Sequence, residues 1–259
     1  MNRPHQDLNM GLTTERLPFR IELASNHTLG KVTALRAAAY GRHMPTFAAQ
    51  LEQPEASDFE SGCEVFVAIS KLDGTALGTL RTHANVYKPL PLQASIDLCG
   101  RFNGTRMVET TRLSIAGGTS SSVVRSALFK ALHLYCLQQK VDWMLAAGRR
   151  PVDRIYDALL FTDVNEPGAY YPMSHAGGVP HRVMAFSPSR AKALWAKNAH
   201  PLYNFVFETE HPDINLSGVK NLDFAWNCPT EMPVSPKASV KAGNPLFSGY
   251  ASFGASMAA

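Results

Sequence analysis

Alternating apolar and polar residues predict a series of strands. Residues 64–70 read E-V-F-V-A-I-S and are apolar at both odd and even positions, which is typical of a strand covered on both faces. Asp73-Gly74 then predicts a hairpin turn, with residues 77–83 as the returning strand. Further strands are predicted at residues 19–23, 107–115, 143–146, 161–164, 170–175 and 181–186.

Apolar residues spaced three or four apart predict the helices. Residues 28–40 place Leu29 and Val32 on one stripe, and residues 123–139 do the same around Leu128. Shorter helices are predicted at residues 44–51, 151–159, 187–197 and 200–211. Strands and helices in this order predict an α/β fold, with a mixed, mostly antiparallel central sheet and helices on both faces.

Composition divides the chain into three parts. Residues 1–17 form a polar leader, residues 18–226 one folded domain, and residues 227–259 a Pro-, Gly-, Ala- and Ser-rich tail. We expect the tail to be poorly ordered, because it offers little apolar surface to bury. Residues 86–103 contain Pro89 and Pro91 and predict a loop or mobile lid within the domain.

The bulk composition, with 45% hydrophobic and 18% charged residues, is that of a globular protein. The net charge of +4 is too small to indicate nucleic-acid binding, although it suits an acidic partner. No apolar run approaches the roughly 18 residues of a membrane span. Without a secretory signal, we expect the four widely spaced cysteines to be reduced and the protein to be cytoplasmic.

Charged residues interrupt two of the predicted strands. Arg81 lies in L-G-T-L-R-T, and Glu109 and Arg112 lie in V-E-T-T-R-L-S-I. Ions are costly inside a sheet unless they are paired or used, so these three form either a structural ion network or a site. In a regular strand Glu109 and Arg112 point to opposite faces. A shared pocket therefore requires a β-bulge, a feature that gathers beside active sites.

A loop of small residues at 116–122 leads into the long helix. Gly117 and Gly118 precede a run of serines that includes Ser121 and Ser122. The loop either binds an anion such as phosphate through its backbone N–H groups or simply caps the helix. It matches neither G-x-x-x-x-G-K-[ST] nor G-x-G-x-x-G.

Other chemistries have less support. No G-x-S-x-G pattern indicates a serine hydrolase. His83 is expected to be packed or exposed rather than catalytic. We expect no metal, because metal-type spacing is missing from His175, His181, His200 and His211.

Five segments carry a family resemblance. They are L-R-A-A-A-Y-G at 35–41, G-T-L-R at 78–81, E-T-T-R-L-S-I at 109–115, P-V-D-R-I-Y-D-A-L-L-F at 151–161, and residues 200–214. Together they resemble the GNAT acyltransferase superfamily, and within it the FeeM-like N-acyl amino acid synthases. The fourth is similar to that family's P-x-x-x-x-Y-x-x-x-G-F helix, with Leu160 where glycine is usual. LuxI-type autoinducer synthases are also similar.

The resemblance implies a GNAT-like fold in which two adjacent strands splay apart and take the pantetheine arm of a thioester donor. R-L-S-I-A-G-G at 112–118 departs from the [QR]-x-x-G-x-[GA] loop of CoA users. An acyl carrier protein (ACP) needs no such loop, so we expect acyl-ACP as donor substrate, with acyl-CoA as the alternative, and no bound cofactor. Donor contacts are expected at Ile115, Gly117, Gly118, Ser121, Ser122 and Tyr156.

The implied reaction moves a long-chain acyl group to the amino group of an amino acid, without a metal or a cysteine nucleophile. Glu109 would act as base directly or through water, with a backbone carbonyl and water as the alternative. Arg112 or Arg81 would hold the acceptor carboxylate or the pantetheine phosphate. Backbone N–H groups of the splayed strand would polarise the thioester carbonyl. An apolar tunnel beside the helix from Val123 would take the acyl chain.

Three other activities stay open at this point. They are a LuxI-type lactone synthase that uses S-adenosylmethionine, a CoA-dependent GNAT acetyltransferase, and a catalytically silent GNAT-like module that binds acyl chains or a partner. A lactone product would identify the LuxI-type synthase, and acetyl-CoA turnover without carrier protein would identify the acetyltransferase. Acyl-ACP binding without product would identify the silent module. The acceptor amino acid and the chain length depend on pocket shape, which the sequence does not define.

Overall fold

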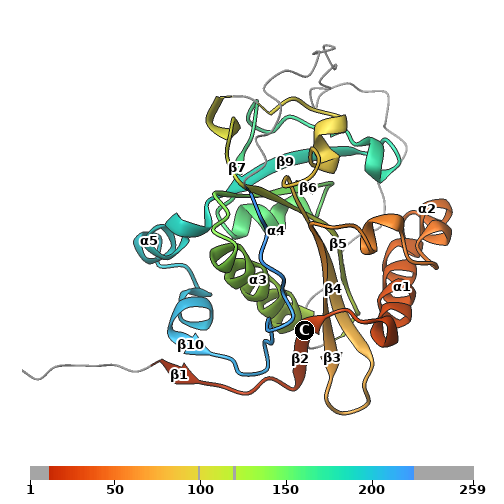
Figure 1. Ribbon diagram of the computed structural model, residues 1–259, viewed down its shortest axis with the longest axis vertical. Helices are drawn as coiled ribbons and strands as arrows, with labels where there is room; N and C mark the ends of the chain where they lie inside the picture. The colour runs from red at the N-terminus through yellow and green to blue at the C-terminus, as the bar shows by residue number, and fades with distance from the viewer. Residues whose placement is uncertain (1–11, 99, 119–120, 225–259) are drawn as a thin grey trace, which may run out of the picture.

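A computed structural model describes residues 12–98, 100–118 and 121–224 (Figure 1). Its centre is an eight-stranded sheet in the order β2-β3-β4-β5-β6-β9-β7, with β8 paired to β9. Most neighbours are antiparallel, whereas β5 and β6 run parallel. The strands are β2 Phe19–Leu23, β3 Cys63–Ser70, β4 Ala76–Ala84, β5 Met107–Ile115, β6 Trp143–Gly148, β7 Thr162–Asp163, β8 Tyr171–Pro172 and β9 Pro180–Phe186.

Helices cover both faces of this sheet, as the sequence predicts. α1 (Asn26–Gly41) and α2 (Pro45–Gln50) lie on one face, and α3 (Ser121–Gln138), α4 (Asp153–Ala158) and α5 (Ala191–Lys197) lie on the other (Figure 1). The central strand β3 serves both layers: Val65, Val67 and Ile69 pack with α1, and Phe66 and Ala68 face the α3 side. The fully apolar pattern of residues 64–70 is thereby explained.

Gly78 sets the close approach between α3 and the sheet. A Cβ atom at this position would lie 2.6 Å from Val124 Cγ1 and 2.9 Å from Leu128 Cδ1. Any side chain at residue 78 would therefore push the helix away from β4. The glycine of the G-T-L-R segment is a packing requirement of the fold.

The parallel pair β5 and β6 separates partway along its length. The ladder runs from Met107 opposite Trp143 to Thr110 opposite Ala146. β5 then continues to Ile115 and β6 to Gly148 without further pairing between them. The two strands therefore splay beyond Thr110, as the family resemblance implies.

The segment predicted as a loop or lid covers one end of the sheet. It contains two short 3₁₀ turns, η2 (Pro91–Ala94) and η3 (Gly100–Phe102). Leu90, Leu92 and Ile96 are buried in a second core beside β9 and the segment after β8. The loop prediction is confirmed, and apolar burial holds the segment against the strands.

Two local predictions were wrong. Residues 170–175 form only the short strand β8, because the chain then turns through η4 (Ser174–Ala176) to the left-handed Gly177. Residues 200–211 form a π-helical turn, η6 (Asn204–Glu208), rather than an ordinary helix, followed by β10 (Thr209–Glu210). The buried Lys130 on α3 holds this segment: its Nζ donates to the carbonyl of Phe205 at 3.0 Å and to that of Thr209.

The described part of the leader contacts the C-terminal end of the domain. β1 (Thr13–Thr14) pairs in parallel with β10. The Leu17 N–H donates to Asp213 Oδ2 at 2.9 Å. Residues 1–11 and the predicted tail from residue 227 lie outside the described residues. In the part of the chain that is described, no helix has the length and apolar character to cross a bilayer.

Candidate active site

A β-bulge at Arg112 brings the charged residues of β5 to one face. Thr79 pairs with Ser114 and Arg81 with Thr111, so the single residue Leu80 lies opposite both Arg112 and Leu113. Arg112 has a φ of 56°, a left-handed conformation that non-glycine residues rarely adopt. The extra residue turns the Arg112 side chain to the face that already carries Glu109 and Thr111. The bulge that Glu109 and Arg112 need in order to share a face is therefore present.

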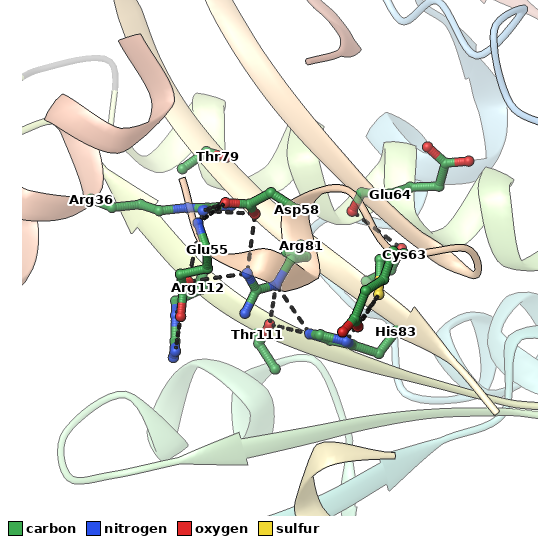
Figure 2. Close-up of polar contacts among 12 residues, drawn as sticks. Arg36, Glu55, Asp58, Cys63, Glu64, Thr79, Arg81, His83, Thr111 and Arg112 are labelled. Atoms are coloured by element: carbon green, nitrogen blue, oxygen red, sulfur yellow. Dashed lines mark hydrogen bonds and ion pairs between the residues drawn. The ribbon is translucent and has the colours of Figure 1, made fainter. Parts of the chain in front are cut away.

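Two acids from the turn before β3 bind three arginines from three elements (Figure 2). Arg112 Nε and Nη2 donate to Glu55 Oε2 and Oε1 at 2.7 and 2.6 Å. Arg81 Nη1 donates to both Glu55 and Asp58 at 3.0 Å. Arg36 of α1 donates to both oxygens of Asp58 at 2.9 Å. We call these five residues the arginine cluster.

The arginine cluster carries one more positive than negative charge, since three guanidinium groups face two carboxylates. Burial alone would raise the pKa of Glu55, but the Arg112 hydrogen bonds and the nearby arginines lower it to about 2. Glu55 is therefore ionised at neutral pH. A buried excess charge is costly, so this cluster is suited to receive one anionic group.

Glu109 stands apart from the arginine cluster. Its side chain has no exposed surface, and Oε2 accepts a hydrogen bond from Leu92 N–H at 2.8 Å. Burial raises its pKa to about 8, and the Leu92 hydrogen bond together with Arg81 and Arg112 opposes that shift only in part. Glu109 is thus no simple counter-ion of the arginines. It is a carboxyl group that titrates near neutral pH, as a general base must.

Two histidines missed as candidates lie beside these groups. His175, on η4, places Nε2 3.4 Å from Glu109 Oε1. His83, opposite Glu109 on β4, accepts a hydrogen bond from Arg81 Nε at 3.0 Å. Burial lowers the pKa of His175 to about 4 and that of His83 to about 3. Both rings are neutral at pH 7, and His83 is packed rather than exposed, with 3% exposure.

A cleft of about 570 Å³ opens beside the arginine cluster. It lies among α2, β5 and the η4 turn. Its polar walls are Glu55, Arg112, Ser174 and His175, and its apolar walls include Phe47 and Met44. Of the residues predicted as catalytic, Arg112 lines this cleft directly. Glu109 lies behind His175, and Arg81 lies behind Glu55.

The predicted donor residues border the splay of β5 and β6, and none of them is among the residues that line this cleft. Ile115 ends β5 and pairs with Gly78. Gly118 adopts a φ of 131°, and its carbonyl accepts from Ser121 N–H at 3.3 Å where α3 begins. Gly117 approaches Arg42, whose Nη1 would lie 3.9 Å from a Cβ atom at residue 117. Ser122 is exposed on the first turn of α3. Donor binding by these residues stays a prediction.

Tyr156 borders the same splay from the β6 side. It is buried on α4, where its ring would lie 3.3 Å from a Cβ atom at Gly148, the last residue of β6. Burial raises the pKa of its hydroxyl above the ordinary value. Leu160, which replaces the usual glycine after this helix, has a φ of 64°. The motif therefore prefers glycine because the chain turns left-handed there.

A separate group of Glu60, Cys63 and His83 has ligand atoms within 4.8 Å of one another. His83 Nε2 accepts from the obligate donor Arg81 Nε, so the neutral ring carries its proton on Nδ1. This Nδ1–H faces Cys63 Sγ at 3.1 Å. Lys88 also binds Glu60. The arrangement favours a hydrogen-bonded thiol over a metal site, because a metal ligand needs an unprotonated nitrogen.

The cysteines visible here are unpaired. Cys63 and Cys136 are free thiols, and burial raises the pKa of Cys63 to about 11. Cys99 and Cys228 lie outside the described residues. The high pKa keeps Cys63 protonated at neutral pH, so it is a poor nucleophile.

The sequence signal for some of these residues was weak. Glu55 and Asp58 lie in a turn, Q-P-E-A-S-D, that looks like an ordinary polar loop. His175 was considered only for metal-type spacing. Two buried arginines did require acidic partners, but the sequence does not say which acids provide them.

Comparisons with solved structures support the fold. The structure resembles FeeM, an N-acyl amino acid synthase from uncultured soil microbes, with a TM-score of 0.53 and 15% identity over 70% of this chain and 96% of that one. A probable acetyltransferase from Staphylococcus epidermidis has a TM-score of 0.47 and 12% identity, over 65% of this chain and 98% of that one. A GNAT-family acetyltransferase from Staphylococcus aureus has a TM-score of 0.46 and 12% identity, over 66% of this chain and 99% of that one. The FeeM match shows that the two chains share a fold.

Sequence comparison identifies the family. No curated protein matches this chain. The family model described as N-acyl amino acid synthase FeeM matches residues 31–183, a span that contains β3 to β8, the arginine cluster, Glu109 and His175. That span is more than half of the chain. The chain therefore belongs to the FeeM family of N-acyl amino acid synthases, and it is an N-acyltransferase.

Proposed function

We propose that this N-acyltransferase moves a long-chain acyl group from an acyl carrier protein thioester to the α-amino group of an amino acid. The observation that carries the proposal is the excess positive charge of the arginine cluster at the wall of the cleft. An α-carboxylate entering the cleft neutralises that charge through Arg112. Its amino group then lies on the side of the cleft that His175 borders, with Glu109 behind the ring.

The acceptor must lose a proton before it attacks the thioester. Glu109 is the base in this proposal, because its pKa of about 8 lets it both accept and release a proton near neutral pH. Positioned general bases contribute roughly 10²- to 10⁴-fold to turnover. The amine attacks the thioester carbonyl directly, and backbone N–H groups of β5 beyond Thr110 stabilise the developing oxyanion.

Charge around the splay supports an acidic carrier as donor. Arg42 approaches the loop before α3, and Arg125 lies on the first turns of that helix. Arg149 and Arg150 directly follow β6, and Arg154 lies on the first turn of α4. These five side chains are exposed or half-exposed. They offer a basic rim for the acidic surface of a carrier protein and for its phosphodiester.

The acyl tunnel stays a proposal. The face of α3 toward the sheet is filled by core side chains such as Leu128, Leu132 and Tyr135. An acyl chain entering there has to displace some of them. The proposal therefore requires repacking of this core when the donor binds.

Reconstitution tests the proposed function. The purified full chain is incubated with long-chain acyl-ACP and each common amino acid, and products are identified by liquid chromatography and mass spectrometry. An N-acyl amino acid that forms with acyl-ACP and is absent with Glu109→Gln supports the proposal. Products formed equally well from acyl-CoA would overturn the carrier as donor, and acetyl transfer alone would overturn the long-chain substrate.

A further inference from the structure

Glu109 is too deeply buried for an acceptor in the cleft to reach it. The side chain has no exposed surface, and one oxygen is occupied by Leu92 N–H. The other oxygen, Oε1, has no hydrogen-bond partner among the described residues. A base in this position needs a second group that contacts both the carboxyl and the cleft.

His175 is the residue that lies between them. It lines the cleft, its side chain is 20% exposed, and Nε2 lies 3.4 Å from Glu109 Oε1. Its turn is fixed from two sides. The Ser174 N–H donates to Ser95 Oγ at 2.9 Å, and Arg112 Nη2 donates to the His175 carbonyl at 3.3 Å. The ring is therefore held in a defined position between the acceptor site and Glu109.

We propose that His175 is a catalytic residue that carries the proton from the acceptor ammonium in the cleft to the Glu109 carboxylate. This inference rests on the proposed function and adds a named residue to it. Nδ1 of the ring is a buried atom. The relay therefore runs through Nε2, the ring nitrogen that lies beside Glu109 Oε1.

Protons and bonds balance in this relay. His175 Nε2 accepts one proton from the ammonium and passes it on to Glu109 Oε1. The neutral amine forms the C–N bond to the thioester carbon, and the C–S bond breaks. A second amine proton goes to the departing thiolate, which leaves as a thiol. Glu109 later returns its proton through His175 Nε2 to solvent in the cleft.

The surroundings keep the His175 ring neutral. Its charged and titratable neighbours are Glu109 and Arg112 on β5, Arg81 and His83 on β4, His181 on β9, and Glu55 across the cleft. Burial, assisted by Arg112, lowers the pKa of His175 to about 4, whereas burial raises that of Glu109 to about 8. The transferred proton therefore rests on Glu109 rather than on the ring.

His175→Gln tests the relay. The glutamine amide nitrogen takes the place of Nε2 beside Glu109 Oε1, but it transfers no proton. With acyl-ACP as donor, we expect kcat to fall roughly 10²-fold while the KM for the acceptor stays within a few-fold. His175→Ala should lose activity similarly and regain it with added imidazole, a rescue that a merely structural histidine would not show.

The matched control is His181→Asn, which removes a nearby buried histidine but keeps a donor for the Val179 carbonyl. Its kcat should stay within about threefold of wild type. Wild-type kcat in His175→Gln, or a change in acceptor KM alone, would overturn the relay and leave the proposed function intact. Wild-type protein that makes no acyl amide would overturn both.

Discussion

Arg112 and Glu55 form a two-bond ion pair, with Nε to Oε2 at 2.7 Å and Nη2 to Oε1 at 2.6 Å. The pair joins the bulge of β5 to the turn before β3, residues 57 positions apart in the chain. Because Arg81 binds the same carboxylate, Glu55 fixes two arginines at once. The cleft wall is therefore held rigid before any substrate arrives, and bound substrate does not bear the entropy cost of ordering it.

Arg112→Lys tests the acceptor site. Lysine keeps the charge but is a single point donor, so it cannot span both oxygens of Glu55 and also hold an acceptor carboxylate. We expect the KM for the acceptor to rise roughly tenfold or more while kcat changes by less, because mainly ground-state binding is lost. The exposed Arg20–Glu22 pair on β2 provides the control, since Arg20→Lys should leave both constants unchanged. An unchanged acceptor KM in Arg112→Lys would exclude Arg112 as the carboxylate ligand.

Glu109→Gln should become more stable relative to wild type as pH rises. The folded pKa of about 8 lies above the ordinary 4.5, so the protonated group's stabilising contribution is fully present below 4.5 and is lost as pH rises through 8. The wild-type minus variant difference in unfolding free energy should shift by up to about 1.4 kcal/mol per pH unit in that window. Urea titrations at several pH values measure it. If the difference in unfolding free energy between wild type and variant did not depend on pH, the pKa of Glu109 would not be raised in the folded state.

Acid should destabilise the domain through His83. Its folded pKa of about 3 lies below the ordinary 6.5, so the stabilising contribution is present above 6.5 and is lost as pH falls toward 3. Between these pH values His83 is protonated in the unfolded chain but stays neutral in the folded one. His83→Asn should flatten the decline in unfolding free energy between those pH values, even if it lowers stability at neutral pH. A variant with the wild-type slope would show that other groups cause the acid sensitivity.

Gly78→Ala should destabilise the fold by about 1–3 kcal/mol, because the new methyl group would meet Val124 and Leu128 at less than van der Waals distance. Gly30→Ala on α1 is the matched control. A Cβ atom there has no neighbour within 4 Å, so the same substitution should stabilise the helix by about 0.5–1 kcal/mol. Thermal or urea unfolding measures both. Equal effects at the two sites would contradict the close packing of α3.

Leu160 shows how a motif and a conformation are connected. The sequence placed a leucine where the family motif has glycine, and the structure gives that residue a left-handed backbone. The sequence shows that Leu160 replaces the motif's glycine, but it does not show why glycine is usual there. Only the φ angle shows that the family's glycine relieves a backbone constraint at the end of α4.

Local chemistry made the elements predictable. The doubly apolar run of β3, the Asp73-Gly74 turn and the stripe of α3 specify their own structure, because backbone periodicity and turn preference act over a few residues. The sequence also singled out Arg81, Glu109 and Arg112. It showed that the last two can share a pocket only with a bulge between them, since strand alternation is a strict geometric rule. The family resemblance came from short segments of this kind.

The pairings of charge were decided only by the tertiary structure. Arg112 binds Glu55 rather than Glu109, and Glu109 faces His175, a residue 66 positions further along the chain. Such partners meet because β5, the turn before β3 and the η4 turn converge after folding. A sequence shows that a buried charge needs a partner, but many acids and histidines can meet that need. Which one does so depends on the packing of the whole sheet.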